Sequence, residues 1–149
     1  MRKRIVILAS GQGSLAQAIF DAAELEIQVV GVVSDRADAQ VLDRAKKASI
    51  NTAVVELTGD RQLWNKQLFD QVDLYKPDLV VSAGFMRILS PEFVNHFPTI
   101  NSHPALLPDF PGAHAVRDAL DAGVSVTGTT IHWVDDGVDT GPIITQMEV

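Results

Sequence analysis

The stretch IVILASGQGSLAQAIFDA, residues 5–22, decides the fold class of this chain. Its first five residues form an uninterrupted apolar run, which is typical of a β-strand buried on both faces. Two glycines, Gly11 and Gly13, then interrupt the run, and the apolar residues that follow recur at helical spacing: Leu15, Ala18, Ile19 and Ala22. Ser14 has the side chain of a helix N-cap. We therefore expect a strand, a glycine loop and a helix capped by Ser14.

The same alternation of apolar runs and amphipathic segments continues along the chain. Strand patterns cover residues 27–33, 52–55, 79–81, 124–134 and a last run from Pro142. Four more helices are expected. One begins after Asp38 as its N-cap, and a longer one covers residues 60–75 with Trp64, Leu68, Val72 and Tyr75 on one face. A short helix begins at Pro91, and a last one covers residues 114–122 and ends before Gly123. Because strands alternate with helices, we expect an α/β fold, a Rossmann-like three-layer α/β/α arrangement around a mostly parallel sheet.

Length and composition favour one soluble domain and exclude several classes of protein. The chain has 149 residues, of which 46% are hydrophobic and 21% charged, and we expect a single domain over residues 1–149. It has no cysteine, which excludes disulfides, thiolate catalysis and cysteine-ligated zinc. The start Met1-Arg-Lys-Arg is too short and too polar for a signal peptide, and no apolar run reaches membrane-spanning length. We expect a cytoplasmic protein with no membrane partner.

The charge balance argues against a nucleic-acid partner. Twelve basic and nineteen acidic residues give a net charge of −7 and a pI near 4.9. Sequence-independent binding of nucleic acid rests on a basic surface, which this composition does not suggest. A small anionic ligand is still compatible with the charge, because backbone N–H groups at the start of a helix hold a phosphate locally.

The glycine loop is compatible with more than one kind of ligand. The segment Gly11-Gln-Gly-Ser-Leu-Ala16 matches the pattern G-x-G-x-x-G/A after a first strand. Asp35 ends the second strand, where dinucleotide-binding proteins place an acid on the ribose, so a nicotinamide-dependent oxidoreductase is one hypothesis. Another anion held by backbone N–H groups is a second, and a tight turn that merely needs glycines is the structural alternative. The loop alone does not decide among them.

A proline-rich stretch, FPTINSHPALLPDFPG at residues 97–112, carries the polar side chains that suggest catalysis. It contains four of the seven prolines, so its backbone is constrained. Asn101 and His103 share one face if they lie on a strand, and Pro104 biases His103 toward extended geometry. An amide and an imidazole held together are able to polarise a carbonyl and to transfer a proton. The structural alternative is a buried Asn and His that satisfy loop backbone.

Several motifs together resemble one family of enzymes. They are Asn101-Ser-His-Pro-Ala-Leu-Leu-Pro108, Phe110-Pro-Gly112, Gly128-Thr-Thr-Ile-His132 and Val138-Asp-Thr-Gly-Pro142, with Ala9–Ser14 and Ala83–Ser90 in support. Over nearly its whole length the chain is similar to the folate-dependent formyltransferases, and the glycine loop near the N-terminus favours the branch that acts in purine biosynthesis. The resemblance implies transfer of a formyl group from 10-formyltetrahydrofolate to the amine of glycinamide ribonucleotide, with small-molecule substrates and no metal.

The resemblance assigns catalysis to Asn101, His103 and Asp139. In this family an amine attacks the formyl carbon, and a tetrahedral intermediate with a developing oxyanion results. Asn101 would donate a hydrogen bond to that oxyanion, and a protonated His103 would stabilise the same charge and then protonate the leaving nitrogen of the folate. Asp139 would raise the pKa of the imidazole and accept a proton from the amine through water.

The resemblance also assigns binding residues. The ribonucleotide phosphate is expected at Gly13, Ser14 and Leu15. The folate is expected at Arg61, Met86, Arg87, Ile88, Leu89, Asn101, Asp135, Asp136, Gly137 and Val138, with Arg61 facing the glutamate carboxylate. The structural alternatives are core packing for Met86 and Ile88, an exposed helix charge for Arg61, and a solvated turn at Asp135 and Asp136.

The chain departs from the family pattern in three places. Leu15 stands where family members usually have Asn, which keeps a backbone N–H but removes a side-chain contact with the phosphate. The connection from Phe97 to Asn101 is slightly short. The family normally continues beyond Val149 with further sheet and a C-terminal helix that helps hold the ribonucleotide. We therefore expect a formyltransferase domain without its C-terminal segment, weakly active or inactive, whose full-length form is active.

Other functions are kept as alternatives. A formyltetrahydrofolate deformylase shares the catalytic trio but normally carries an extra N-terminal regulatory domain. A methionyl-tRNA formyltransferase needs an RNA-binding extension, which the net charge does not suggest, and a pure binding module is a further class. A zinc site of His103, His132 and Asp139 matches no metal motif, and we expect His132 to be a buried structural residue. A homodimer is the assembly to test.

Overall fold

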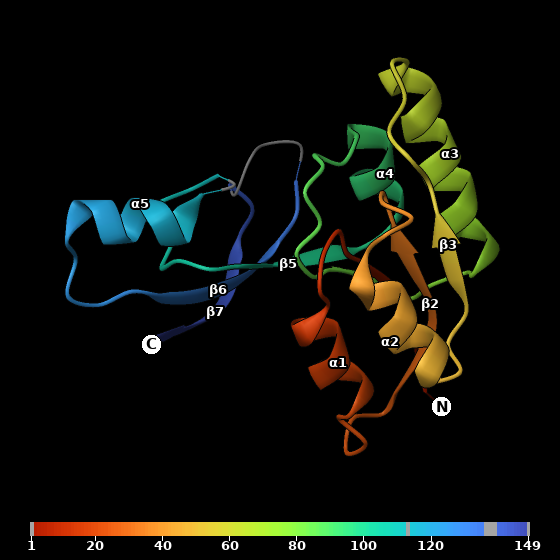
Figure 1. The fold of residues 1–149 in the computed structure, drawn as a ribbon, viewed down its shortest axis with the longest axis horizontal. Coiled ribbons are helices and arrows are strands. Elements are labelled where there is room, and N and C mark those ends of the chain that lie inside the picture. Colours follow the sequence, from red (N-terminus) through yellow and green to blue (C-terminus); the bar gives the residue numbers. More distant parts are fainter. Residues whose placement is uncertain (1, 113, 136–139, 149) are drawn as a thin grey trace.

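The computed structural model describes residues 2–112, 114–135 and 140–148. Its strands are β1 (Lys3–Leu8), β2 (Ile27–Ser34), β3 (Thr52–Val54), β4 (Leu79–Ser82), β5 (Thr99–His103), β6 (Gly128–Trp133) and β7 (Ile143–Glu148). They form one sheet in the order β3-β2-β1-β4-β5-β6-β7 (Figure 1). Strands β1 to β5 pair in parallel, whereas β6 and β7 join antiparallel. The expected mostly parallel sheet is therefore confirmed.

The described ranges contain five helices, of which the first four cover both faces of the parallel strands. They are α1 (Ser14–Phe20), α2 (Gln40–Lys47), α3 (Arg61–Leu74), α4 (Pro91–His96) and α5 (Ala115–Ala122). Alternate residues of β1 point to opposite faces, as in any strand. Ile5 and Ile7 pack in one apolar cluster with residues of α1 and α2, and Val6 and Leu8 pack in a second cluster with residues of α3 and α4. The three-layer α/β/α arrangement follows from this alternation.

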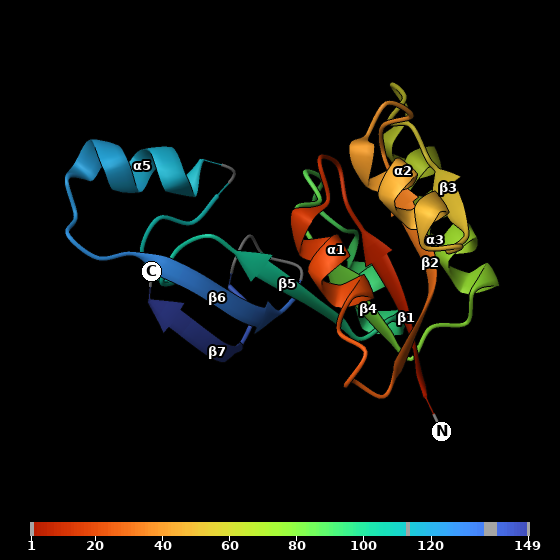
Figure 2. The same ribbon diagram turned by 60° about the horizontal axis from the view of Figure 1, so that its bottom comes forward.

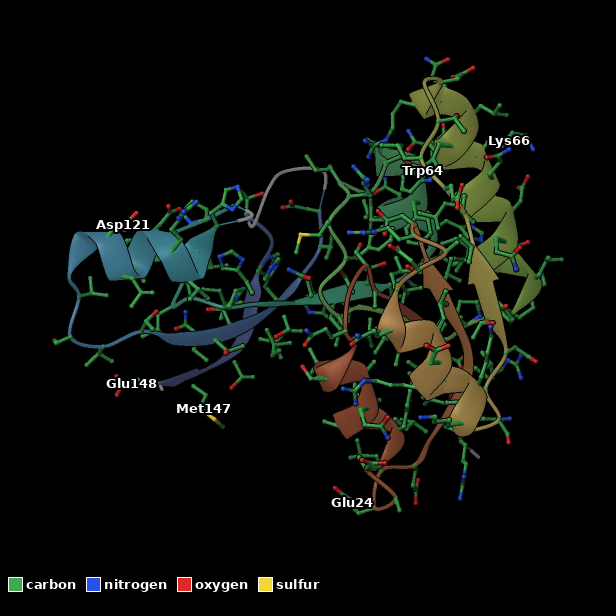
Figure 3. The ribbon with its side chains drawn as sticks, viewed as in Figure 1. Glu24, Trp64, Lys66, Asp121, Met147 and Glu148 are labelled. Carbon is green, nitrogen blue, oxygen red and sulfur yellow. The ribbon has the colours of Figure 1, made fainter. Side chains whose placement is uncertain are left out.

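Trp64 shows how α3 is fixed to its face of the sheet. Its side chain is fully buried, and its indole Nε1 donates a hydrogen bond to the Val55 carbonyl at 2.8 Å. Figure 3 shows Trp64 on the inner side of α3 and Lys66, two residues on, directed outward. Leu68 and Val72 continue the buried stripe, so the predicted face of this helix is confirmed. The indole hydrogen bond satisfies a donor that would otherwise be costly to bury.

Helix α5 lies apart from the other four helices. Figures 1 and 2 show it at the far end of the molecule, beside β6 and β7. Ala115 and Ala119 are its buried residues, and Gly123 ends it with a φ of 68°, a left-handed geometry that suits glycine. The predicted helix and its glycine stop are confirmed.

Two of the expected helix caps are wrong. The N-cap of α1 is Gly13, with Ser14 already inside the helix, and the N-cap of α2 is Ala39. The Asp38 carboxylate instead pairs with Arg36, whose Nη2 lies 3.1 Å from Oδ2. By contrast, Asp60 caps α3 by accepting from the Leu63 N–H, and Pro91 occupies the first turn of α4 as expected.

The strand expected over residues 124–134 begins only at Gly128. A strand exists only where a neighbour supplies hydrogen bonds. Among the described residues, β5 pairs with β6 from Thr130 to Trp133, and β7 pairs with it from Gly128 to His132. The apolar alternation at 124–127 therefore has no strand beside it, and the prediction was too long for that reason.

The carboxyl ends of β2, β1, β4 and β5 lie along one edge of the sheet, because these strands are parallel and adjacent. In open α/β sheets this edge is the usual place for a ligand. None of the helices within the described ranges is long and apolar enough to cross a membrane.

Candidate active site

A pocket of about 420 Å³ opens at this carboxyl edge. Its size falls in the range of small-molecule sites, roughly 300–1,000 Å³. It lies between the segment that follows β4 and the ends of β5 and β6, and it is lined by Ser82, Gly84, Phe85, Met86, Arg87, Ile88, Leu89, Asn101, Ser102, His103, Pro104, Gly112, His132, Val134, Asp135, Thr140 and Gly141. Many of the residues expected from the sequence to form the site therefore meet in one cavity.

Asn101 and His103 both lie on β5 and both line the pocket. The strand places them two residues apart and hence on one face, as expected. His103 is buried, and Asn101 is half-buried. An amide and an imidazole thus stand together at the wall of the cavity on a strand that is paired on both sides.

The orientation of the Asn101 amide is set by His132 on the neighbouring strand. Asn101 and His132 are direct partners in the β5–β6 register, and Nδ2 of Asn101 lies 3.2 Å from Nε2 of His132. An amide nitrogen only donates, so Nε2 of His132 is the acceptor and its proton is on Nδ1. Nδ1 lies 2.9 Å from the Trp133 carbonyl, which accepts that proton. His132 is buried, as expected, and it leaves one N–H of Asn101 for another partner.

His103 is held by the proline-rich loop that follows it. Its Nε2 lies 2.7 Å from the Phe110 carbonyl, and because a carbonyl only accepts, Nε2 is the donor in this contact. The loop is in turn fixed by Thr130 on β6, whose hydroxyl donates to the Ala105 carbonyl and accepts from the Leu107 N–H. Gln146 on β7 adds a bond from Nε2 to the Leu107 carbonyl at 2.9 Å. Strands β6 and β7 therefore position the loop.

Asp139, the third expected catalytic residue, lies outside the described residues, and so do Asp136, Gly137 and Val138 of the expected folate site. The residues on either side of them do line the pocket. Asp135 and Thr140 both contribute to its wall, and the Thr140 hydroxyl donates to Oδ1 of Asp135 at 2.8 Å.

The segment after β4 forms the opposite wall. Met86 and Ile88 are 62% and 59% exposed, so the alternative that they belong to the core is wrong. Leu89 is buried and packs in the α3/α4 cluster with Phe93. The segment is tied to β1 through Ser10, whose hydroxyl accepts from the Met86 N–H at 2.8 Å and whose N–H donates to the Gly84 carbonyl. Two exposed apolar side chains thus line the pocket from an anchored backbone.

Arg61 approaches this wall from α3 but is not among the described residues that line the pocket. Its Nη2 donates to the Ile88 carbonyl, and its Nε donates to Oδ1 of Asn65 at 3.2 Å. The guanidinium carbon also lies 4.8 Å from the centre of the Trp64 ring, in cation–π contact. Arg61 therefore supports the backbone of the wall in addition to any contact with a ligand.

Asp35 is not available to a ribose in the way that the dinucleotide hypothesis requires. Its side chain is 1% exposed, and its Oδ2 accepts from Nε of Arg87 at 2.7 Å. The acid at the end of β2 is thus engaged with the pocket wall. No local sequence pattern indicated this pair, because 52 residues separate its members.

The glycine loop lies outside the pocket as far as the described lining residues show, and its carbonyls turn toward the protein. The carbonyl of Gly11 accepts from the Val41 N–H, that of Gln12 from Nε of Arg44, and that of Gly13 from the Gln17 N–H. No side chain of the described chain caps α1. The N–H groups of its first turn, which include those of Ser14 and Leu15, have no acceptor within the helix, as at any helix start.

Gly13 is required in this loop for two reasons. Its φ is 82°, in the left-handed region that side chains disfavour, and a Cβ there would lie 2.5 Å from Cγ2 of Val41 on α2. The loop therefore approaches α2 more closely than a residue with a side chain permits.

Within the described ranges, no group of three or more histidine, aspartate or glutamate side chains is placed to hold a metal ion. The zinc alternative is not tested by this, because Asp139 lies outside those ranges.

Known proteins resemble this chain over nearly its whole length. The formyl transferase family model matches residues 3–149. The chain is 48% identical over 152 residues to phosphoribosylglycinamide formyltransferase of Mycobacterium tuberculosis, covering 98% of this chain and 70% of that protein. It is 45% identical over 152 residues to the Escherichia coli protein of the same name, covering 97% of this chain and 72% of that protein.

Solved structures extend the comparison to the fold. The crystal structure of glycinamide ribonucleotide transformylase 1 from Symbiobacterium toebii superposes with a TM-score of 0.95 at 41% identity, covering 99% of this chain and 73% of that one. Both the sequence and the arrangement of its elements thus lead to one conclusion. This chain belongs to the formyl transferase family.

Proposed function

We propose that this protein transfers a formyl group from 10-formyltetrahydrofolate to the amine of glycinamide ribonucleotide, a step of purine biosynthesis. The observation that carries the proposal is the pairing of Asn101 and His103 on β5, at the wall of a pocket of about 420 Å³. The relatives in Mycobacterium tuberculosis and Escherichia coli, named phosphoribosylglycinamide formyltransferase, support the choice of substrate.

Asn101 is proposed to stabilise the oxyanion. The substrate amine attacks the formyl carbon, a C–N bond forms, and the formyl oxygen gains negative charge. The Asn101 amide has two N–H groups, of which one is directed to Nε2 of His132. The other is proposed to donate to the oxyanion, and because its direction is fixed in advance, it costs no reorganisation during the reaction.

His103 is proposed to supply the proton that releases the folate. In the second half of the reaction the bond between the formyl carbon and N10 breaks, and N10 needs a proton as it leaves. An imidazolium at His103 is suited to donate it and to stabilise the preceding negative charge. Asp139 is proposed to favour this imidazolium and to take the proton that the attacking amine loses, through water.

The two substrates are proposed to bind on either side of this pair. The pteridine would lie against the backbone of Met86, Arg87, Ile88 and Leu89 on one wall and of Asp135, Asp136, Gly137 and Val138 on the other. Arg61 is proposed to face the glutamate end of the folate, which its position beside Ile88 supports. The phosphate of the ribonucleotide is proposed at the N–H groups of Gly13, Ser14 and Leu15, where Leu15 contributes backbone only.

The remaining attributes of the protein are proposals of the same kind. We propose that residues 1–149 form one formyltransferase domain, which works in the cytoplasm on small molecules and uses no metal. The oligomeric state that we test for is a homodimer. Sedimentation of the purified chain over a range of concentrations tests the assembly.

A deformylation assay tests the proposed function. The change in folate absorbance is followed with and without glycinamide ribonucleotide, for the wild type and for His103→Ala, with the Escherichia coli relative run in parallel. For the full-length form we expect turnover that requires the ribonucleotide and is lost in His103→Ala, and for residues 1–149 alone we expect weak turnover or none. Turnover without the ribonucleotide would indicate a deformylase instead. NADH binding together with no loss of formyl would favour the oxidoreductase hypothesis.

A further inference from the structure

The buried carboxylate of Asp35 has no role in the reaction as proposed, although it lies next to the pocket wall. We propose that Asp35 is a positioning residue for folate binding: it fixes the side chain of Arg87 and, through it, the wall formed by residues 84–90. The proposal rests on the proposed function for the identity of the ligand.

The pair spans three strands at the carboxyl edge. Asp35 follows β2, and Arg87 lies in the segment that follows β4, with β1 between those two strands in the sheet. The Arg87 side chain therefore reaches across the end of β1 to place its Nε 2.7 Å from Oδ2 of Asp35. At 2.7 Å the contact has the length of a strong charge-assisted hydrogen bond.

The two side chains of the pair differ in how deeply they are buried. The Asp35 side chain is 1% exposed, whereas that of Arg87 is 35% exposed and lines the pocket. Oδ1 of Asp35 is buried without a hydrogen-bond partner among the described residues, so Nε of Arg87 supplies the one side-chain hydrogen bond that the structure gives this carboxylate. A buried carboxylate without a partner is strongly unfavourable, and Arg87 is held in place for that reason.

Asp35 differs from the other groups that hold this wall. Ser10 accepts from the Met86 N–H, and Arg61 donates to the Ile88 carbonyl, so both hold backbone atoms. Asp35 holds a side chain that itself lines the cavity. Its loss is therefore expected to reorient Arg87 and to loosen the wall, while the two backbone anchors keep this segment from unfolding.

Binding experiments on the variant Asp35→Asn test the proposal. Asn keeps the shape of the side chain and removes its charge. Titration calorimetry with 10-formyltetrahydrofolate, without ribonucleotide, is expected to give a Kd about tenfold weaker than the wild type, the effect of removing the charge from one charge-assisted hydrogen bond. The Kd of glycinamide ribonucleotide is expected to stay within about twofold, because Asp35 acts on the folate wall alone. Asp38→Asn, which breaks the exposed pair with Arg36, is the matched control and should change neither value.

A double-mutant cycle asks whether Asp35 acts through Arg87. If it does, Asp35→Asn introduced into Arg87→Gln adds little to the weakening of folate binding that Arg87→Gln already causes. Additive effects of the two substitutions would overturn the proposal. So would wild-type folate affinity in Asp35→Asn, or an equal weakening of both ligands, which would indicate a general structural role.

Amide hydrogen exchange tests the same link without any ligand. In Asp35→Asn the N–H groups of residues 84–90 are expected to exchange faster than in the wild type, and in Asp38→Asn they should not. A wild-type chain that binds no folate would contradict the proposed function. Unchanged exchange in Asp35→Asn would contradict the role of Asp35 even in that case.

Discussion

The two halves of the sheet differ in how completely they are covered. Strands β1, β2 and β4 lie between two layers of helices, and Val6, Ile7 and Leu8 of β1 are fully buried. Strand β7 at the opposite edge is exposed at every residue, and Leu120 on the nearby α5 is 76% exposed. Met147 and Glu148 of β7 are directed away from the rest of the molecule in Figure 3.

Strand β5 lies at the boundary between these halves. It pairs in parallel with β4, the last strand of the covered half, and antiparallel with β6, the first strand of the exposed half, which consists of β6, β7 and α5. Asn101 and His103 are therefore fixed on one side by a rigid core and positioned on the other by groups from β6 and β7, such as His132, Thr130 and Gln146. We infer that stability and catalysis are largely separable in this protein, and the following substitutions test that separation.

The largest expected effect is on the reaction. His103→Ala is expected to lower kcat by about 10²–10⁴-fold, the usual range for removal of a general acid. The free energy of unfolding should change little by comparison, because the loop that contacts His103 is also held by Thr130. Steady-state kinetics and urea unfolding measure the two quantities. His96→Ala, at an exposed histidine of α4, is the control, and an equal loss of kcat in both variants would contradict the assignment.

A substitution in the covered half is expected to lower the free energy of unfolding and to leave kcat of the folded protein nearly unchanged. Leu68→Ala in α3 removes a side chain that is 2% exposed and should lower the free energy of unfolding by about 2–5 kcal/mol. Leu74→Ala, in the same helix at a 75% exposed position, is the matched control and should have almost no effect. Urea unfolding measures both. If kcat of the folded Leu68→Ala protein fell as far as that of His103→Ala, the two halves would not be separable.

The glycine loop lies on the covered side but is proposed to bind a substrate, so a change there should affect both properties. Gly13→Ala places a Cβ against Val41 at a φ of 82° and is expected to cost about 1–3 kcal/mol of stability. It should also weaken binding of glycinamide ribonucleotide, measured by calorimetry. Gly11→Ala, in the same loop with no atom within 4 Å of the added Cβ, should be much milder. Equal losses in the two variants would show that the close approach to α2 is unimportant.

The sequence predicted the strand boundaries of the covered half better than those of the exposed half, and the reason is physical. Strands buried on both faces appear as continuous apolar runs, so β1, β2 and β4 were found near their observed positions. The start of β6 depends on where β5 and β7 stop pairing with it, which no local pattern records. The same limit applies to His132, whose contact with Asn101 follows from the antiparallel register.

Polar contacts were predictable only where they are local. The stacking of Arg61 on Trp64 joins residues three apart on one helix, a spacing at which side chains meet, although it was not among the contacts that we expected. The pair of Asp35 and Arg87 joins residues that follow two different strands, so only the sheet order reveals it. The spacing of Asn101 and His103 and the adjacent proline predicted their shared face, whereas the resemblance to the formyltransferases supplied their expected catalytic role.

The smallest expected effect belongs to the exposed pair of Arg36 and Asp38. The side-chain hydrogen bond from Arg36, aided by its charge, holds the pKa of Asp38 below its ordinary value. A carboxyl whose pKa is lowered on folding contributes stability above its unfolded pKa and loses it as the pH falls through its folded pKa. Because both side chains are solvated, this contribution is small, and Asp38→Asn should unfold in urea with the wild-type midpoint at neutral pH. NMR titration should still find the lowered pKa of Asp38 in the wild type. A clear loss of stability in Asp38→Asn would mean that a surface ion pair of the covered half supports the fold as its core does.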